Sequence, residues 1–295
     1  MFKLSGVIPP MITPFDQFGN LDELQLVSLI QYLKQHVQGL FICGSYGCGP
    51  MMSLSERKLV AEITVKTVNK SIPVIVHVGT TNTRDTVDLA KHARDIGCDA
   101  IAAVGPYYYT HSENDIFHFY SDILTAVGPE FPVYLYNNPK FQGYEINIST
   151  IQMLKEIGLY GVKDATFNIM TYAKYCQEFG YSDFDIVLGT EAMWLSARAF
   201  GCQAFIPGLG NAFPELCVRM WNEGMKNDFS KCKETQFLIN KIRSLMYIAG
   251  STQQAVYCMA SIRGIIHSYP RSPFTPASQE DAMRLREELK KIGVL

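Results

Sequence analysis

The 295-residue sequence lacks any apolar run long enough to cross a bilayer, and it lacks a long run of basic residues. Its formal net charge is −2, and 18% of its residues are charged. These absences argue against nucleic acid and against an anionic membrane as the main partner. Residues 1–15 hold one lysine and three prolines in place of the basic and then apolar pattern of a secretory signal, so we expect a cytoplasmic protein.

Metal-binding patterns are also missing from the sequence. The eight cysteines form no C-x-x-C pair, and no group of cysteines and histidines has zinc spacing. We therefore expect reduced cysteines and no metal site. His77 lies in an apolar stretch and is predicted to be a hydrogen-bonded core residue. Cys48 is predicted to fill space, because no histidine lies nearby in the sequence to activate its thiol.

What the sequence does contain is an alternation of short apolar runs and longer amphipathic ones. Eight strands are predicted, at 6–9, 39–43, 74–78, 100–104, 133–136, 161–163, 186–188 and 204–207. Helical spacing is predicted between them, at 21–37, 55–69, 83–96, 113–127, 149–157, 169–179, 191–200 and 212–225. Ser53-x-x-Glu56 predicts a capping box, and Gly97 and Gly158 stand where helix C-terminal caps belong.

This alternation is typical of an α/β protein built as a (β/α)8 TIM barrel, here with a C-terminal helical extension. A doubly wound open sheet is the alternative, which is weakened because no G-x-G-x-x-G follows the first strand. We expect residues 1–225 to form the barrel. Residues 226–295, with helices at 229–248, 251–262 and 276–292, are expected to pack on it.

Lys163 ends the predicted sixth strand, and Asp164 follows it directly. Active sites of TIM barrels lie at the C-terminal ends of the strands. A buried ammonium is costly unless it is paired or loses its proton. Lys163 therefore either reaches water or pairs with Asp164, or it is a neutral amine that forms a Schiff base with a ketone.

Hydroxyl groups are predicted to gather near this lysine. Tyr136 ends the fifth strand, one strand away from Lys163, and can carry protons if other hydroxyls connect to it. Ser45 and Tyr108 are the candidates for that connection. The alternative for residues 107–109 is an aromatic lid or a subunit contact.

The loops after the second, seventh and eighth strands supply the predicted substrate-binding residues. The backbone amides of Ser45 and Tyr46 lie in a glycine-rich loop and can hold a carboxylate. The remaining predicted substrate-binding residues are Gly189, Glu191, Ile206 and Gly208. Glycine-rich loops are often only turns, which is the alternative for each of these segments.

Five motifs, in this order, carry a family resemblance. They are I-T-P-F at 12–15, G-S-Y-G-C-G-P at 44–50, G-P-Y-Y at 105–108, Y-N-N-P at 136–139 and G-V-K-D-A-T at 161–166. With them the chain resembles the pyruvate-dependent Schiff-base aldolase family, which includes N-acetylneuraminate lyase, dihydrodipicolinate synthase and 2-keto-3-deoxygluconate aldolase. The resemblance implies a homotetramer, often a dimer of dimers, that needs no metal or organic cofactor.

The same resemblance implies a role for each catalytic candidate. Lys163 would form the imine with pyruvate or another 2-keto acid, and Tyr136 would act as the acid and base beside it. Ser45 would link Tyr136 to Tyr108 of the partner subunit. The amides of Ser45 and Tyr46 would bind the keto-acid carboxylate.

Departures from the family pattern bear on the substrate. Phe141 stands where the synthase branch carries an arginine for a second carboxylate, Tyr46 replaces a threonine, and Cys48 replaces an acid. Contacts of the sialic-acid branch are replaced by Ala165, Ala192 and Gly208. We therefore expect the sugar-acid branch, with reversible cleavage of a 2-keto-3-deoxy sugar acid to pyruvate and an aldehyde.

Three alternatives to this activity stay open. The first is N-acetylneuraminate lyase or dihydrodipicolinate synthase-like activity. The second is dehydration or deamination of a keto acid through the same imine. The third is a non-catalytic barrel that only binds keto acids.

Overall fold

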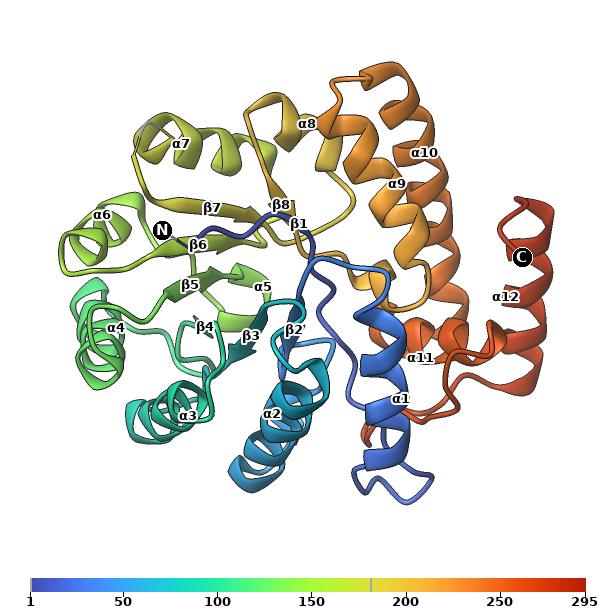
Figure 1. The fold of residues 1–295 in the computed structure, drawn as a ribbon, viewed down its shortest axis with the longest axis horizontal. Helices are drawn as coiled ribbons and strands as arrows, with labels where there is room; N and C mark the ends of the chain where they lie inside the picture. The colour runs from blue at the N-terminus through green and yellow to red at the C-terminus, as the bar shows by residue number, and fades with distance from the viewer. Residues whose placement is uncertain (1, 181) are drawn as a thin grey trace.

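The computed structural model describes residues 2–180 and 182–295, and within them eight parallel strands form one sheet (Figure 1). The strands are β1 (Gly6–Val7), β2 (Leu40–Ile42), β3 (Val74–His77), β4 (Ala100–Val104), β5 (Val133–Asn137), β6 (Gly161–Asp164), β7 (Asp185–Leu188) and β8 (Ala204–Phe205). Their order in the sheet is β1-β8-β7-β6-β5-β4-β3-β2. Each predicted strand is present, with ends that differ by one or two residues, which confirms the (β/α)8 fold.

The segment after β1 closes the sheet into a ring. Phe41 in β2 donates its amide to the Pro9 carbonyl at 3.0 Å, and Met11 donates its amide to the Phe41 carbonyl at 2.9 Å. Because β1 also pairs with β8, every strand has a neighbour on both sides. Closure removes the exposed edges that an open sheet would leave, so the doubly wound alternative is wrong.

Helices surround the strands in Figure 1. Each predicted helix is present, with ends that differ from the prediction by up to four residues. The helices up to β8 are α1 (Glu23–Leu33), α2 (Leu54–Val68), α3 (Thr83–Asp95), α4 (Glu113–Val127), α5 (Pro139–Gln142), α6 (Ile148–Glu156), α7 (Ile169–Phe179) and α8 (Trp194–Ala199). After β8 come α9 (Pro214–Met225), α10 (Phe229–Leu245), α11 (Thr252–Ile262) and α12 (Gln279–Lys291). The short helix α5 was not predicted, because its four residues are too few to show a helical period.

Capping residues define several of these helix ends. Ser53 and Glu56 form the predicted capping box of α2, with the serine hydroxyl accepting from the Glu56 amide and the carboxylate accepting from the Ser53 amide. Gly97 follows the last residues of α3 with φ +82°, a backbone conformation that side chains with a Cβ rarely adopt.

Side chains inside the ring of strands form one core, and those between strands and helices form another. Alternation along β5 sends Tyr134 and Tyr136 into the ring and Leu135 toward the helices. The same alternation on β6 sends Lys163 into the ring, where its nitrogen approaches two aromatic rings. Lys163 and Tyr136 therefore lie next to each other in the inner core.

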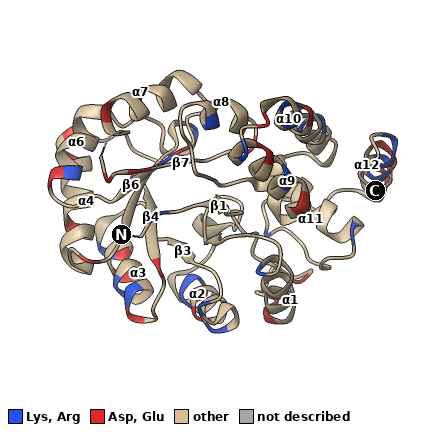
Figure 2. Cartoon of the chain, turned by 45° about the horizontal axis from the view of Figure 1, so that its top comes forward, with Lys and Arg blue, Asp and Glu red and all other residues tan. Residues whose placement is uncertain are grey.

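The C-terminal helices α10, α11 and α12 follow the barrel, and α12 lies at its outer edge in Figure 1. Helix α10 packs on α8 and α9, and α11 packs on α12. The boundary at residues 225 and 226 stays a prediction. Charged residues of both signs are interspersed over the outer helices in Figure 2. Among the described residues, no helix has the length and apolar character that a membrane crossing requires.

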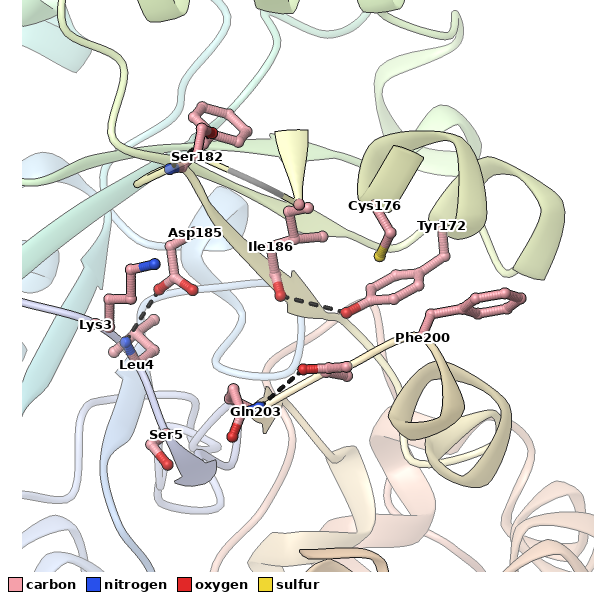
Figure 3. Close-up of a pocket in the computed structure, with 14 residues that line it drawn as sticks. Lys3, Leu4, Ser5, Tyr172, Cys176, Ser182, Asp185, Ile186, Phe200 and Gln203 are labelled. Atoms are coloured by element: carbon pink, nitrogen blue, oxygen red, sulfur yellow. Dashed lines mark hydrogen bonds between the residues drawn. The ribbon is translucent and has the colours of Figure 1, made fainter. Parts of the chain in front are cut away.

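A cavity of about 370 Å³ opens at the N-terminal ends of strands β1, β7 and β8 (Figure 3). Lys163 does not line it. Asp185 lies in this cavity, where its carboxylate accepts the Leu4 amide at 3.0 Å and the Tyr134 hydroxyl at 2.8 Å. Through these two bonds, Asp185 connects the N-terminal segment at Leu4 to Tyr134 of β5. This end of the molecule is therefore built for stability.

Candidate active site

Lys163 is 4% exposed and lies directly across from Tyr136 in the register of β5 and β6. Its nitrogen is 3.7 Å from the ring centre of Tyr136 and 3.7 Å from the ring centre of Phe41. Lys163 is thus held inside the ring of strands, so the alternative of a lysine that reaches bulk water is wrong. Asp164 points to the opposite face of the sheet, and the predicted alternative of a Lys163–Asp164 pair is also wrong.

Burial sets the protonation state of Lys163. Loss of hydration lowers the pKa of the Lys163 amine well below its usual value, and no acidic side chain among the described residues offsets that loss. Desolvating an ammonium costs several kcal/mol, whereas a cation over aromatic faces recovers only about 2 kcal/mol. Desolvation is the larger effect, and it favours the neutral, nucleophilic form of the amine.

Tyr136 accepts and donates hydrogen bonds at the end of β5. Its hydroxyl lies 3.4 Å from the Ser45 Oγ, and the Asn138 Nδ2 donates to it at 2.9 Å. Burial raises the pKa of the Tyr136 phenol, while the bonds from Ser45 and Asn138 lower it. The phenol therefore has two fixed polar neighbours and is oriented toward the mouth of the barrel.

Sequence reasoning missed Asn138. This residue is 3% exposed, and its side-chain oxygen has no hydrogen-bond partner in the structure. Its position could have indicated this contact, because Asn138 follows Tyr136 by two residues and strand residues i and i+2 lie on the same face. Asn138 is held in turn by Gln142 in α5, whose side-chain oxygen accepts the Asn138 amide at 3.3 Å.

His77 is buried and hydrogen-bonded, as predicted from the sequence. The Val104 amide donates to its Nε2 at 3.2 Å, so its proton is on Nδ1 and points to the Cys43 carbonyl at 3.2 Å. Burial, Arg57 and Lys163 all lower the pKa of His77, which keeps the ring neutral. Its ring meets the Tyr136 ring edge-on, with centroids 5.8 Å apart.

The glycine-rich loop after β2 is wound tightly at the barrel mouth. Cys43 and Cys48 have positive φ angles of 58° and 54°, and a Cβ at Gly49 would lie 1.8 Å from the Cys43 carbonyl oxygen. The amides of Ser45 and Tyr46 donate to no acceptor among the described residues. Two free, adjacent N–H groups of this kind are suited to a carboxylate.

Tyr46 extends from this loop across the mouth toward β8. A Cβ added at Gly208 would lie 2.2 Å from the Tyr46 Cζ, so the ring rests on the glycine. Burial raises the pKa of the Tyr46 phenol, and the Glu191 carboxylate raises it further. Tyr46 and Gly208 therefore form one unit, in which the small residue makes room for the large one.

Glu191 is fully occupied by protein groups. Its carboxylate accepts the Arg243 guanidinium at 2.6 Å, the Gly208 amide at 3.1 Å and the Leu209 amide at 3.4 Å, and the residue is 1% exposed. The arginine comes from α10, so the C-terminal helices support the loop after β8. Glu191 can shape the site through this network, and its oxygens already have donors.

The remaining predicted residues lie at different depths. Gly189 donates its amide to the Asp164 carbonyl at 2.6 Å, and Ile206 is buried in the inner core. Tyr108 is 84% exposed, with φ +84°, and does not reach the Tyr136 hydroxyl of its own chain. Cys48 is buried, which raises the pKa of its thiol, and its Sγ lies 3.7 Å from the Tyr257 hydroxyl.

The fold and this geometry define a class of protein: a (β/α)8 barrel with a buried lysine and a tyrosine at the C-terminal ends of neighbouring strands. The model of the dihydrodipicolinate synthetase family matches residues 3–292 of this chain. The 4-hydroxy-tetrahydrodipicolinate synthase of Methanopyrus kandleri is 31% identical over 298 residues, which cover 100% of this chain and 98% of that protein.

Solved structures agree with this match. A catalytic-lysine mutant of Ruminococcus gnavus sialic acid aldolase superposes with a TM-score of 0.92 at 26% identity, covering 98% of this chain and 95% of that one. The dihydrodipicolinate synthase of Aquifex aeolicus superposes with a TM-score of 0.91 at 25% identity, covering 99% of both chains. The chain belongs to the dihydrodipicolinate synthetase family. It is an enzyme of the lyase and aldolase class that this family comprises.

Proposed function

We propose that this enzyme forms a Schiff base between Lys163 and the keto group of pyruvate or a related 2-keto acid, and that it makes or breaks the bond between C3 and C4. The single observation that carries the proposal is the lysine nitrogen held without a counter-ion 3.7 Å from the ring centre of Tyr136. A neutral amine beside a proton carrier is what imine chemistry needs.

In the cleavage direction, the Lys163 nitrogen adds to C2, the Tyr136 hydroxyl gives its proton to the departing C2 oxygen, and water leaves, which gives an iminium and a Tyr136 phenolate. The phenolate oxygen then takes the proton of the C4 hydroxyl. The C3–C4 bond breaks, an aldehyde forms, and the electron pair moves into the iminium to give an enamine. Protonation at C3 and addition of water then release pyruvate and restore the amine.

The free amides of Ser45 and Tyr46 support the binding of the keto-acid carboxylate. Ser45 connects to Tyr136 and can relay its proton outward. Its next partner is proposed to be Tyr108 of the partner subunit, in a homotetramer. The exposed position of Tyr108 on its own chain supports this arrangement. The sugar acid expected from the sequence, the cytoplasmic location and the tetramer stay predictions.

Borohydride reduction in the presence of pyruvate tests the proposal. We expect one irreversible adduct per chain, mapped by peptide mass spectrometry to Lys163, and none on the matched variant Lys163→Met. The exposed Lys140 serves as an internal control for nonspecific modification. An unmodified Lys163 under saturating pyruvate would refute the proposal. Product analysis then separates carbon–carbon cleavage from dehydration or deamination through the same imine.

Tyr108→Phe tests the shared hydroxyl separately. We expect this variant to keep its adduct with pyruvate and to lose about 10²-fold or more in kcat, the range for loss of a proton carrier. Tyr109→Phe, the adjacent exposed tyrosine, is the matched control and should keep full activity. Equal activity of the two variants would exclude Tyr108 from the relay.

A further inference from the structure

A second cavity of about 260 Å³ opens at the C-terminal end of the barrel, beside Ser45 and His77. Ser45 Oγ is 3.4 Å from the Tyr136 hydroxyl, which marks where C4 of the substrate would lie. A group attached to C4 and directed past Ser45 would therefore enter this cavity. Its size lies just below the roughly 300–1,000 Å³ of pockets for drug-sized ligands, so it suits a small aldehyde.

The walls of this cavity are mostly apolar. Cys48, Met51, Val104, Phe141 and Phe274 line it, and none of its lining residues is an aspartate, glutamate, lysine or arginine. Two charged side chains near the barrel mouth, Glu191 and Arg57, already have hydrogen-bond partners in the protein.

Glu191 is committed to Arg243 and two amides. Arg57 donates to the Gly79 and His77 carbonyls and does not line the cavity. Among the described residues, no charged side chain lines the cavity to recognise a second carboxylate.

The polar side chains of the lining are those of Ser45, His77, Tyr107 and Gln253, beside the Cys48 thiol. Both nitrogens of His77 already have partners, the Cys43 carbonyl and the Val104 amide, and the Gln253 side-chain oxygen accepts the Thr252 hydroxyl at 3.1 Å. On the opposite side of the mouth, the Tyr46 ring rests on Gly208 and closes the route past β8. The apolar part of the wall would leave hydroxyl groups of a polyol without partners, whereas an apolar group would lose only water there.

We infer that the acceptor end of the site takes an aldehyde with an apolar body, aromatic or branched aliphatic, in preference to a polyol or a dicarboxylate. The inference rests on the proposed Schiff-base function. Phe141 is its main determinant, because this ring is 45% exposed at α5 and stands on the rim of the cavity. The enzyme would then condense the pyruvate enamine with such an aldehyde, forming one carbon–carbon bond and protonating the new C4 oxygen.

The test compares three aldehydes in condensation with pyruvate: benzaldehyde, glyceraldehyde and succinic semialdehyde. We expect kcat/KM for benzaldehyde to exceed the other two values by about tenfold or more, the range that apolar complementarity provides. Phe141→Ser should lower the benzaldehyde value by about tenfold and change the glyceraldehyde value by less than about threefold. Phe167→Ser, which replaces a phenylalanine that is 54% exposed and does not line the cavity, is the matched control.

Several outcomes overturn the inference. Faster turnover of glyceraldehyde or succinic semialdehyde than of benzaldehyde would do so. So would an unchanged aldehyde preference in Phe141→Ser, because the Phe141 ring would then have no part in selecting the aldehyde. Borohydride trapping with pyruvate alone distinguishes a failure of the Schiff-base proposal from a failure of the aldehyde preference. An adduct at Lys163 without aromatic turnover refutes only the acceptor class, and the absence of an adduct refutes both.

Discussion

Tyr46 and Gly208 are expected to depend on each other for stability. In Gly208→Ala the new Cβ would lie 2.2 Å from the Tyr46 Cζ and 2.3 Å from its Oη, whereas carbon atoms pack at about 3.5–4.0 Å. The ring must move by more than about 1 Å in a well-packed mouth, and overpacking of this kind costs about 1–3 kcal/mol. Tyr46→Ala removes the obstacle, so the double variant should lose about 1–3 kcal/mol less than the sum of the single variants.

Urea unfolding at one fixed protomer concentration measures this coupling, because the stability of an oligomer depends on concentration. Trp194, which is fully buried, supplies the fluorescence signal. Gly224→Ala is a useful comparison, since its Cβ would meet a different ring, that of Trp194, and should show no coupling to Tyr46. If the free energies of Tyr46→Ala and Gly208→Ala add to within about 0.5 kcal/mol, the contact between ring and glycine does not have the role assigned to it.

Three further predictions concern protons. Lys163→Met should give no pyruvate adduct and should be at least as stable as the parent at pH 7. Unfolded lysine holds its proton below about pH 10.4 and the buried one does not, so the difference in urea midpoint should shrink as the pH rises toward 10. A constant difference would contradict a neutral Lys163. Asn138→Leu removes a donor to the Tyr136 oxygen, so the pKa seen in the kcat profile should rise and kcat should fall about tenfold, with trapping at Lys163 retained. An unmoved pH profile would limit Asn138 to packing. Burial raises the pKa of Asp164 to about 6, so the parent should lose on the order of 3 kcal/mol of stability as the pH rises from about 4 to 6 and remain level above that. In Asp164→Asn, the fall in stability between about pH 4 and 6 should be smaller. An equal fall in both proteins would contradict a raised pKa of Asp164.

The fold and the central pair of residues could be predicted because their signals are local. Short apolar runs separated by amphipathic stretches gave all eight strands, and strand-end positions placed Lys163 beside Tyr136. Because side chains alternate along a strand, the register of β5 and β6 is then enough to place both side chains inside the ring. The limits of helices such as α8 were less accurate, because its six residues span fewer than two turns.

Features that depend on distant parts of the chain could not be predicted. The Glu191–Arg243 ion pair joins the end of β7 to α10, and the Tyr46–Gly208 contact joins the loops after β2 and β8. Nothing in either local sequence indicates its partner. As a result, Glu191 was expected to bind substrate, whereas its oxygens are taken by protein donors. The pairing of Glu191 with Arg243 of α10 is visible only in three dimensions.

The register of β6 determines which of two adjacent titratable side chains meets the substrate. Lys163 faces the inner core and Asp164 faces the helices, where the Thr166 amide donates to its carboxylate at 3.0 Å. A shift by one residue would exchange them, because neighbouring strand residues point to opposite faces. The inner cavity would then hold a carboxyl group, which cannot form an imine. Hydrogen bonding of β6 to both β5 and β7 fixes the register, and in this way the closed ring of strands selects the amine as the reactive group.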